Sequence, residues 1–391
     1  MAEPSSSLLL VAGEASGDLH GAHLLEALRQ LRPDLAVRGI GGPLLRQAGM
    51  EVRIDVAELS AAGLVEIAAS IPRHWRVMRW LRRQMDQQRP AAVVLVDYPG
   101  FNLMVAREAH RRGIPVFFYI APQVWAWGRG RARRMAGFID RLAVIFPFEE
   151  PIFNAHGRRF ARYVGHPLLD ALQVSGSPAE TRARHGFSGE QPLLLLMPGS
   201  RRSEIRLLLP DLLQAARQLR RDGWQVALLQ APTLSQAWME SMAGPEGLDL
   251  PVIAGDRYNL LAAADVVLAS SGTATLEAAL LGCPPVIVYR FSWLTYWLAW
   301  LVIGRRIMGL PNVVLGRPVF PELLQREVRP EALVRAVQAN QGRRPELQAA
   351  IRELRSRMGA PGASLRAAED LLNLLDSGPP LPSAPARRSR P

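Results

Sequence analysis

Hydrophobic residues along the chain fall into short uninterrupted runs, separated by longer segments with helical patterns. The runs are SLLLVA (7–12), AVRGI (36–40), AAVVLV (91–96), PVFFYI (115–120), RLAVIF (141–146), PLLLLM (192–197), WQVALLQ (224–230), LPVIAG (250–255), DVVLAS (265–270) and PPVIVY (284–289). Such runs are typical of parallel strands buried on both faces. Helical patterns cover 19–31, 207–220 and 273–281, among others. The chain is therefore predicted to be an α/β protein with two Rossmann-like, doubly wound parallel sheets.

The runs form two sets, and the small, polar segment 174–180 lies between them. This pattern predicts one domain over residues 1–173 and a second over residues 174–355. Ligands bind beyond the carboxyl ends of the strands in such sheets, so the two domains are expected to face a cleft. Residues 356–376 contain a last helix, which we expect to pack back on the first domain or to be exchanged in a homodimer. The Pro-, Ser- and Arg-rich residues 377–391 are expected to be disordered.

Composition narrows the classes of function. The formal charge is +12, and all 47 basic residues are arginine. The absence of lysine excludes a P-loop lysine, a Schiff-base lysine and a pyridoxal phosphate lysine. Cys283 is the only cysteine, which excludes an internal disulfide and cysteine-based zinc sites. No Asp-x-Asp pair, nucleic-acid-binding motif or signal-peptide pattern is present, so we expect a cytosolic protein without a metal or a nucleic-acid partner.

The first of three Gly-rich loops, AGEASGD (12–18), follows an apolar run and leads into a helix that Asp18 is expected to open. Backbone N–H groups at such a helix start can receive an anion or a sugar hydroxyl. The alternative is a tight turn that needs glycine dihedral angles. This loop alone does not decide between the two interpretations.

The second loop is Pro198-Gly199-Ser200-Arg201, after the run 192–197. Ser200 is expected to cap the following helix, with Glu204 near a capping-box position. An arginine beside a helix N-terminus suits a diphosphate. The alternative is a capped helix with a solvated arginine.

The third loop is Ser270-Ser271-Gly272-Thr273, and a helix begins there. Glu277 lies one turn past Thr273 on the same helical face. Its carboxylate could bind two ribose hydroxyls while the loop amides hold phosphate, or it could only complement the helix dipole. Two loops of this kind in one parallel sheet favour a nucleotide diphosphate site.

Asp97 is the candidate general base. It comes directly after the apolar run 91–96, and an acid at the carboxyl end of a strand faces the ligand side of the sheet. Such a carboxylate could take the proton from an attacking hydroxyl. The alternative is that Asp97 caps the helix predicted over 102–112. Because the chain has no Asp-x-Asp pair to bind a metal, arginine and helix dipoles would have to neutralise a leaving nucleotide.

Eight motifs resemble those of the lipid-A-disaccharide synthase family and occur in family order within residues 7–376. They are AGEASGD (12–18), DYPGFN (97–102), PQVWAW (122–127), FPFE (146–149), VGHPLLD (164–170), PGSR (198–201), SSGTATLE (270–277) and LPNVVLG (310–316). Together these motifs are highly specific.

The resemblance implies a two-domain glycosyltransferase of the GT-B fold that needs no cofactor. The implied reaction transfers 2,3-diacylglucosamine from its UDP derivative to the 6-hydroxyl of 2,3-diacylglucosamine 1-phosphate (lipid X). Inversion gives a β-1,6 disaccharide 1-phosphate and UDP. The resemblance makes Asp97 the essential acid and Arg201 important for activity. It also implies donor contacts in the second domain, at Gly199, Ser200, Ser271, Gly272, Thr273, Glu277 and Asn312, and acceptor or cleft contacts in the first, at Glu14, Ser16, Gly17, Asp18, Asn102, Gln123 and Trp125.

One position departs from the family pattern. Many members carry a second Asp in motif 97–102, where this chain has Gly100, so the base role concentrates on Asp97. One alternative function is that of another UDP-sugar transferase or a UDP-N-acetylglucosamine 2-epimerase of the same architecture. The other is a non-catalytic nucleotide-sugar sensor or membrane adaptor, which would need no base at Asp97.

Acylated substrates would require contact with a bilayer, which we expect to be the anionic cytoplasmic surface of the inner membrane. The apolar residues that share one helical face in segment 64–88 are Ile71, Trp75, Met78, Leu81 and Met85. Arginines lie mostly opposite, a combination that suits a headgroup interface or, alternatively, a helix that packs on a core. The Trp-rich segment 291–304 is shorter than the roughly 20 residues that a spanning helix needs. It is expected to be interfacial, a dimer contact or buried core.

Overall fold

A computed structural model of the chain describes residues 7–59, 64–122, 124, 130–155, 157–231, 234–243, 250–290 and 308–377, with the backbone alone for 64–71. Contacts divide the chain into two compact units: Met1–Leu169 with Ala360–Pro391 (unit 1), and Asp170–Gly359 (unit 2). The unit boundaries at 169 and 359 therefore differ from the predicted ones at 173 and 355. The predicted tail, apart from Ser377, lies outside the described residues.

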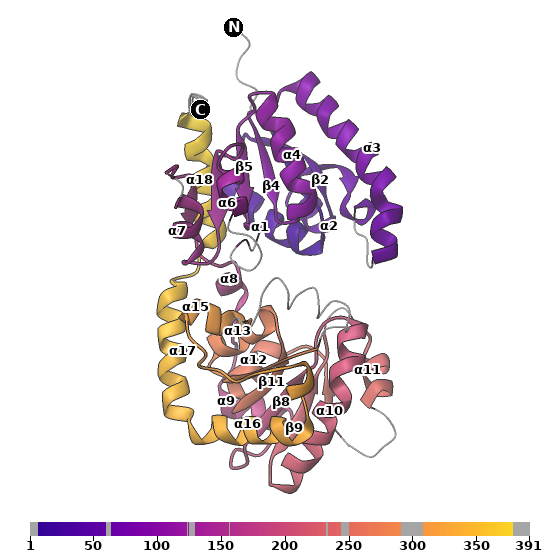
Figure 1. Cartoon of the computed structure of the whole chain (residues 1–391), viewed down its shortest axis with the longest axis vertical. Helices are drawn as coiled ribbons and strands as arrows, with labels where there is room; N and C mark the ends of the chain where they lie inside the picture. The colour runs from indigo at the N-terminus through magenta and orange to yellow at the C-terminus, as the bar shows by residue number, and fades with distance from the viewer. Residues whose placement is uncertain are drawn as a thin grey trace, which may run out of the picture. The chain divides into compact units, whose positions relative to one another are not determined.

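Each unit contains one sheet in which all neighbouring strands are parallel (Figure 1). The sheet of unit 1 has the order β3-β2-β1-β4-β5-β6-β7. Its strands are β1 (Ser7–Ala12), β2 (Ala36–Gly41), β3 (Glu51–Asp55), β4 (Ala92–Val96), β5 (Val116–Tyr119), β6 (Arg141–Val144) and β7 (Ala161–Tyr163). The chain moves outward in opposite directions from the adjacent strands β1 and β4, so their carboxyl ends form the switch point where ligands bind in this topology.

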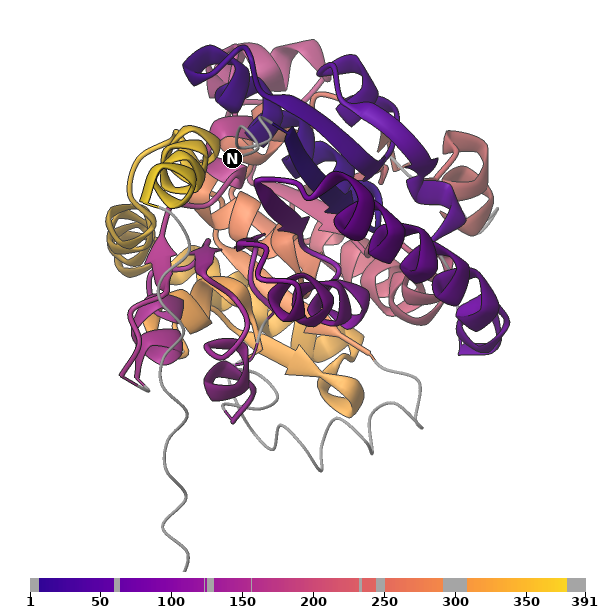
Figure 2. The same cartoon turned by 90° about the horizontal axis from the view of Figure 1, so that it is seen from above.

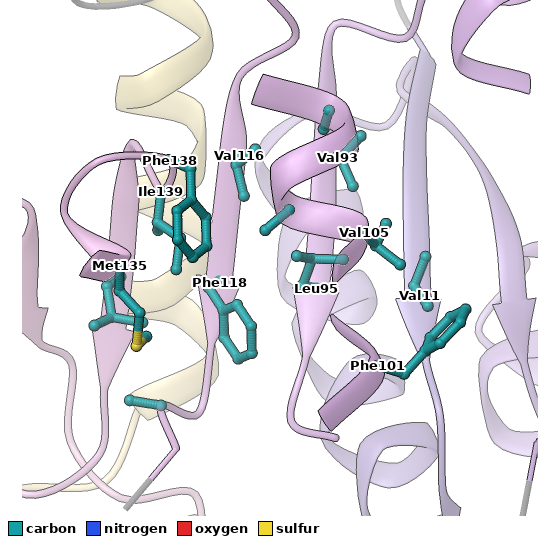
Figure 3. Close-up of a cluster of buried hydrophobic side chains, with 14 of the residues drawn as sticks. Val11, Val93, Leu95, Phe101, Val105, Val116, Phe118, Met135, Phe138 and Ile139 are labelled. Atoms are coloured by element: carbon teal, nitrogen blue, oxygen red, sulfur yellow. The ribbon is translucent and has the colours of Figure 1, made fainter. Parts of the chain in front are cut away.

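Helices cover both faces of the unit 1 sheet (Figures 1 and 2). They are α1 (Ala15–Leu31), α2 (Pro43–Gln47), α3 (Leu64–Gln88), α4 (Pro99–Arg111), α6 (Gly130–Met135), α7 (Glu149–Asn154) and α18 (Ala363–Ser377), with a short 3-10 turn, η1, at Val56–Glu58 and α8 (Leu168–Ala171) at the unit boundary. On one face, α3 and α4 bury a core against alternate residues of β1, β4 and β5. Figure 3 shows Phe101 and Val105 of α4 beside Val11, Val93 and Leu95 of the strands.

The sheet of unit 2 has the order β10-β9-β8-β11-β12-β13. Its strands are β8 (Leu193–Met197), β9 (Gln225–Leu229), β10 (Val252–Ile253), β11 (Val266–Ser270), β12 (Pro285–Tyr289) and β13 (Glu322–Leu324). Its helical elements are α9 (Pro178–Arg184), α10 (Arg202–Arg221), α11 (Gln236–Ala243), α12 (Arg257–Ala263), α13 (Thr273–Leu281), α15 (Leu310–Leu315), η2 (Gln325–Glu327), α16 (Pro330–Gly342) and α17 (Arg344–Met358). The two doubly wound parallel sheets predicted from the apolar runs are confirmed.

The last helix, α18, belongs to unit 1 although it follows all of unit 2 in sequence. It packs against α1 and against the strands β5 and β6. The Arg366 guanidinium donates to the carbonyl oxygens of Val164 (2.7 Å), Ala360 (2.9 Å) and Pro361 (2.8 Å). Because one side chain ties three carbonyls together, the return of the chain to unit 1 is fixed at the start of α18.

The apolar face of α3 is part of the core, which corrects the prediction that it meets the membrane. Met78 and Leu81 are 6% and 0% exposed, and Met85 is 1% exposed. All three pack in the cluster formed with β1, β4 and α4. Trp75 differs from them because 63% of it is exposed, and the side chain of Ile71 lies outside the described residues. The amphipathic pattern of α3 is therefore explained by core packing, and Trp75 lies at the exposed edge of the apolar stripe.

Replacing Leu81 by alanine should lower the free energy of unfolding by about 2–5 kcal/mol, because it leaves a cavity in a fully buried site. Chemical denaturation monitored by circular dichroism measures this change. Leu365→Ala on α18 is the matched control, since Leu365 is 40% exposed and its loss should cost about 0.5 kcal/mol or less. Equal effects of the two substitutions would contradict the core position of Leu81.

Candidate functional site

In unit 2, the loops that follow β8 and β11 line one cavity of about 260 Å³. The two strands are adjacent, and Met197 pairs with Ala269 near their carboxyl ends. The lining residues are Met197, Gly199, Ser200, Arg201, Glu204, Leu229, Gln230, Ala231, Arg257, Ser270, Ser271, Gly272, Thr273 and Ala274. The structure thus brings together the second and third loops that the sequence singled out, at the switch point of this sheet.

Glu204 shapes the loop at 198–201. Its carboxylate accepts hydrogen bonds from the Ser200 N–H (3.3 Å) and from the Arg201 guanidinium (3.0 Å). Gly199 has φ +128°, and a Cβ there would lie 2.6 Å from a Glu204 oxygen, so the turn requires glycine. The predicted Ser200 cap is wrong: α10 begins at Arg202, and its N-cap residue, Arg201, makes no side-chain capping bond. Because 76% of the Arg201 side chain is exposed, its guanidinium remains accessible to an anion.

The loop at 270–273 ends at the N-terminus of α13. Gly272 has φ +149°, and a Cβ there would meet nothing within 4 Å, so the backbone is open to close approach. The Thr275 hydroxyl donates to the Gly272 carbonyl at 2.8 Å and fixes the turn. Thr273 and Ala274, the first residues of α13, line the cavity. The first N–H groups of a helix have no acceptor within it, which makes this end of the cavity suitable for phosphate.

Glu277 is placed behind the cavity rather than in its lining. It is 7% exposed and forms an ion pair with Arg257, which comes from the start of α12 and does line the cavity. Burial raises the pKa of the Glu277 carboxyl, and the Arg257 charge opposes that rise. In this structure Glu277 therefore orients an arginine of the cavity, whereas the sequence predicted direct ribose contact. Sequence reasoning missed Arg257, because nothing in AGDRYN (254–259) marks it.

Three polar atoms at the cavity are buried without a hydrogen-bond partner among the described residues. They are Gln230 Oε1, Arg257 Nε and Ser270 Oγ. Unpaired buried polar groups are costly unless something satisfies them. Each of the three atoms is covered by protein, so a ligand in the cavity could pair with it only after a side chain turns.

Asn312 does not face this cavity, which corrects its predicted nucleotide contact. It is 0% exposed. Its amide donates to the Phe320 carbonyl (2.8 Å) and to the Glu322 carboxylate (2.7 Å), and its Oδ1 accepts from the N–H groups of Val319 and Phe320. With every donor and acceptor in use, Asn312 holds the connection between α15 and β13.

In unit 1, the loops after β1 and β4 meet at the corresponding switch point. Ala12 pairs with Val96 at the ends of these strands, and the Ser16 hydroxyl donates to the Asp97 carboxylate at 3.2 Å. Asp97 does not cap a helix, because α4 begins at Pro99 with Tyr98 as its N-cap residue. Its carboxylate is therefore available for other chemistry.

The environment of Asp97 favours a proton acceptor. Burial raises the pKa of the Asp97 carboxyl, and hydrogen bonds from the Tyr98 N–H and the Ser16 hydroxyl only partly oppose that rise. A carboxylate with a raised pKa holds an abstracted proton more firmly than an ordinary one. The arrangement can therefore assist the attack of a hydroxyl group.

Asn102 is a support for Asp97, which corrects its predicted place in the acceptor cleft. It is 0% exposed, and its amide donates to the backbone carbonyls of Asp97 (2.7 Å) and Val96 (3.2 Å). Gly17 lets α1 approach β4, because a Cβ there would lie 3.2 Å from the Val96 carbonyl oxygen. At Gly100, by contrast, a Cβ would meet nothing within 4 Å. A second acid would therefore fit at that position.

Asp18 is also structural, and its predicted cleft position is wrong. It is 3% exposed, and its carboxylate accepts from the backbone N–H groups of Gly42 (2.6 Å), Leu44 (3.1 Å) and Leu45 (3.1 Å). It anchors the start of α2, while the N-cap of α1 is Glu14, which is half-buried. The predicted cleft residues Gln123 and Trp125 lie outside the described residues, as does segment 291–307.

Among the described residues, no group of three or more His, Cys, Asp or Glu side chains could hold a metal ion. The described part of unit 2 offers arginines and amides to an anion, and the described part of unit 1 offers a carboxylate to a proton. Such a pair of sites suits transfer of a group from a phosphate leaving group to a hydroxyl.

Comparisons with known proteins identify the family. A family model described as lipid-A-disaccharide synthetase matches residues 8–358. The lipid-A-disaccharide synthase of Syntrophus aciditrophicus (strain SB) is 43% identical over 379 residues, covering 95% of this chain and 98% of the relative. That of Myxococcus xanthus (strain DK1622) is 40% identical over 376 residues, with the same coverage.

Solved structures share the fold at lower identity. CalG4, the calicheamicin glycosyltransferase, has a TM-score of 0.62 and 16% identity, covering 96% of this chain and 99% of that one. Because identity is so low, this likeness concerns the GT-B architecture alone. The family model and the two close relatives carry the assignment: the chain belongs to the lipid-A-disaccharide synthetase family of glycosyltransferases.

Proposed function

We propose that this enzyme transfers 2,3-diacylglucosamine from its UDP derivative to the 6-hydroxyl of 2,3-diacylglucosamine 1-phosphate. The products are the β-1,6-linked disaccharide 1-phosphate and UDP. The family supports the substrate class. The observation that carries the mechanism is the Asp97 carboxylate, which lies at the switch point of unit 1, has a raised pKa and accepts a hydrogen bond from the Ser16 hydroxyl.

In the proposed mechanism, Asp97 accepts the proton of the acceptor hydroxyl as its oxygen forms a bond to C1 of the donor sugar. The bond between C1 and the phosphate oxygen breaks, and its electron pair leaves with UDP. Attack on the face opposite the leaving group inverts the configuration at C1. Arg201, Arg257 and the first amides of α13 are the groups that we expect to bind the diphosphate and to stabilise its developing charge. Unit 1 would then bind the acceptor and unit 2 the donor.

Asp97→Asn should lower turnover by about 100- to 10,000-fold, the usual contribution of a general base. UDP affinity should stay within about twofold, because asparagine has nearly the size of aspartate and Asp97 lies outside the unit 2 cavity. Acceptor-dependent release of UDP from the acylated donor measures turnover, and isothermal titration calorimetry measures UDP binding.

The matched control for Asp97 is Asp34→Asn, since Asp34 is an exposed acid of unit 1 that pairs with Arg32. This control should keep full turnover. Near-normal turnover of Asp97→Asn would contradict the base assignment. UDP release by the unaltered protein that does not depend on acceptor would contradict transfer and would favour hydrolysis of the donor, whereas no UDP release with the acceptor present would favour a non-catalytic sensor.

Arg201→Ala should weaken UDP binding by about 10- to 100-fold, because a hydrogen bond to a charged group contributes about 1.5–3 kcal/mol. The substitution should leave the melting temperature unchanged, since the side chain is 76% exposed. Arg202→Ala is the control: the Arg202 guanidinium lies over the Trp238 ring at 5.2 Å, and Arg202 is not part of the cavity lining. Equal UDP affinity in the two variants would exclude Arg201 from the donor site.

We further propose that the outer face of α3 binds the anionic cytoplasmic surface of the inner membrane. This face carries Trp75, which is 63% exposed, and the exposed arginines Arg76, Arg79 and Arg83. These positions recur at helical spacing, and none of the three arginines has a carboxylate partner within the described part of the chain. An aromatic ring among unpaired arginines suits a headgroup interface. No helix in the described residues is long and apolar enough to cross a bilayer.

Replacing Arg76, Arg79 and Arg83 together by Gln should reduce binding to vesicles with anionic lipid by about 100-fold, at about 1 kcal/mol for each arginine. Vesicle flotation at physiological salt measures the loss. The control carries the same charge change at the exposed arginines Arg220, Arg221 and Arg335 of unit 2. Equal losses from both triple variants would show that binding follows net charge rather than the face of α3.

A homodimer remains a prediction. In the structure, the C-terminal helix α18 packs on α1 of the same chain.

A further inference from the structure

Asp97 and the residue after it have an unusual backbone conformation. Asp97 has φ +51° and Tyr98 has φ +49°, so two consecutive residues with side chains adopt the left-handed region. This region costs free energy for residues other than glycine and persists only where surrounding contacts enforce it. The direction of the Asp97 carboxylate therefore depends on whatever holds these two residues.

Backbone contacts hold the Asp97 side of the turn. The Asp97 N–H donates to the Tyr119 carbonyl at 2.9 Å, and the Asp97 carbonyl accepts from the side-chain amide of Asn102 at 2.7 Å. The Tyr98 carbonyl accepts from the Asn102 N–H at 3.1 Å. These bonds fix the peptide groups of the turn, and the Tyr98 side chain adds contacts of its own.

The Tyr98 side chain is held at both ends. Its ring lies on Gly13, where a Cβ would come within 2.0 Å of a ring carbon. Its hydroxyl lies 3.0 Å from His74 Nε2 and donates to the Leu59 carbonyl at 3.3 Å. Since a phenol has one proton to donate, the bond to Leu59 requires His74 to donate through Nε2 to the hydroxyl oxygen. The Tyr98 hydroxyl thus connects the turn to α3 and to the end of η1.

His74 is itself packed so that it can hold this hydroxyl. Its ring is stacked on that of Tyr98, with centroids 6.3 Å apart, and meets the edge of Phe101 at 5.4 Å. Phe101 belongs to the buried core of unit 1. The contacts therefore run from the core through His74 and Tyr98 to the backbone of Asp97.

We propose that Tyr98 and His74 are positioning residues, whose hydrogen bond holds the left-handed turn that aims the Asp97 carboxylate at the acceptor hydroxyl. This inference rests on the proposed role of Asp97 as the base. Neither side chain needs to touch a substrate. Their effect is on the geometry of the base, and small displacements of a catalytic group cost large factors in rate.

The test is the pair of substitutions Tyr98→Phe and His74→Phe, which remove the hydrogen bond and keep both aromatic rings. Each should lower kcat by about 10- to 100-fold, with the donor KM within about twofold. The double variant should be no slower than the slower single variant, because both break the same contact. Tyr163→Phe is the control: Tyr163 is a half-buried tyrosine of the same sheet, on β7, and its loss of a hydroxyl should leave kcat unchanged.

A second readout separates positioning from a merely structural role. Burial is the main cause of the raised pKa of Asp97, so a loosened turn that admits water should lower that pKa. The acid limb of the pH–rate profile should therefore move to lower pH in Tyr98→Phe. Carbon-13 NMR of labelled Asp carboxyls, with Asp97→Asn to assign the signal, should show the same direction of change.

Unchanged kcat and unchanged Asp97 titration in Tyr98→Phe would overturn the inference while Asp97→Asn still confirms the base. A lower melting temperature with an unchanged pH profile would also overturn it, because that result indicates stability alone. If the unaltered enzyme released no UDP on addition of acceptor, the proposed function would fail. The NMR titration would still test whether Tyr98 sets the environment of Asp97.

Discussion

Burial of both faces of each parallel sheet is the constraint on which the rest of the structure depends. The central strands β1, β4, β8 and β11 are apolar along almost their whole length and are buried throughout or nearly so. Polar side chains near the centre of either sheet therefore lie beyond the ends of its strands. The switch points β1/β4 and β8/β11 gather the carboxyl ends of strands that leave in opposite directions. All the chemistry proposed for this enzyme lies at these two places.

The two units use their polar residues in complementary ways. In unit 2, the carboxylates of Glu204 and Glu277 hold Arg201 and Arg257, which bring positive charge to the cavity. In unit 1, neutral groups hold one carboxylate: Asn102 fixes the backbone of Asp97, and Ser16 donates to its side chain. Because few charges oppose the burial of Asp97, its pKa stays raised. One unit is thus suited to a leaving diphosphate and the other to an incoming hydroxyl.

Sequence patterns predicted the sheets well because buried parallel strands are continuous apolar runs. They missed β3, β7 and β13, which lie at sheet edges, are short, and carry charged or half-exposed residues such as Glu51, Arg162 and Glu322. The loops at 198–201 and 270–273 were predicted correctly to share one site, since glycine and serine after a strand mark a βα turn. The unit boundaries at 169 and 359 differ by four residues each from the predicted ones at 173 and 355.

Individual residue roles were harder to predict than loops. Asp18, Asn102 and Asn312 belong to motifs that mark the site. Their side chains nevertheless form hydrogen bonds with backbone groups, and Asn312 also with Glu322, so they support the site from within the protein. A motif does not distinguish residues that contact a ligand from residues that only support the site. The apolar stripe of α3 suggested a membrane face, but one periodic stripe suits a core equally well, and the core takes Met78 and Leu81. Arg257 and His74 act through contacts between elements far apart in sequence, which no local pattern contains.

The most direct test of the account is mass spectrometry and NMR of the products that the purified enzyme forms from the two acylated monosaccharides. The account predicts one new species with the mass of the disaccharide 1-phosphate, a β-1,6 linkage, and one UDP for each disaccharide formed. Free diacylglucosamine, an epimerised donor or an α linkage would contradict the proposal of inverting transfer to the acceptor hydroxyl.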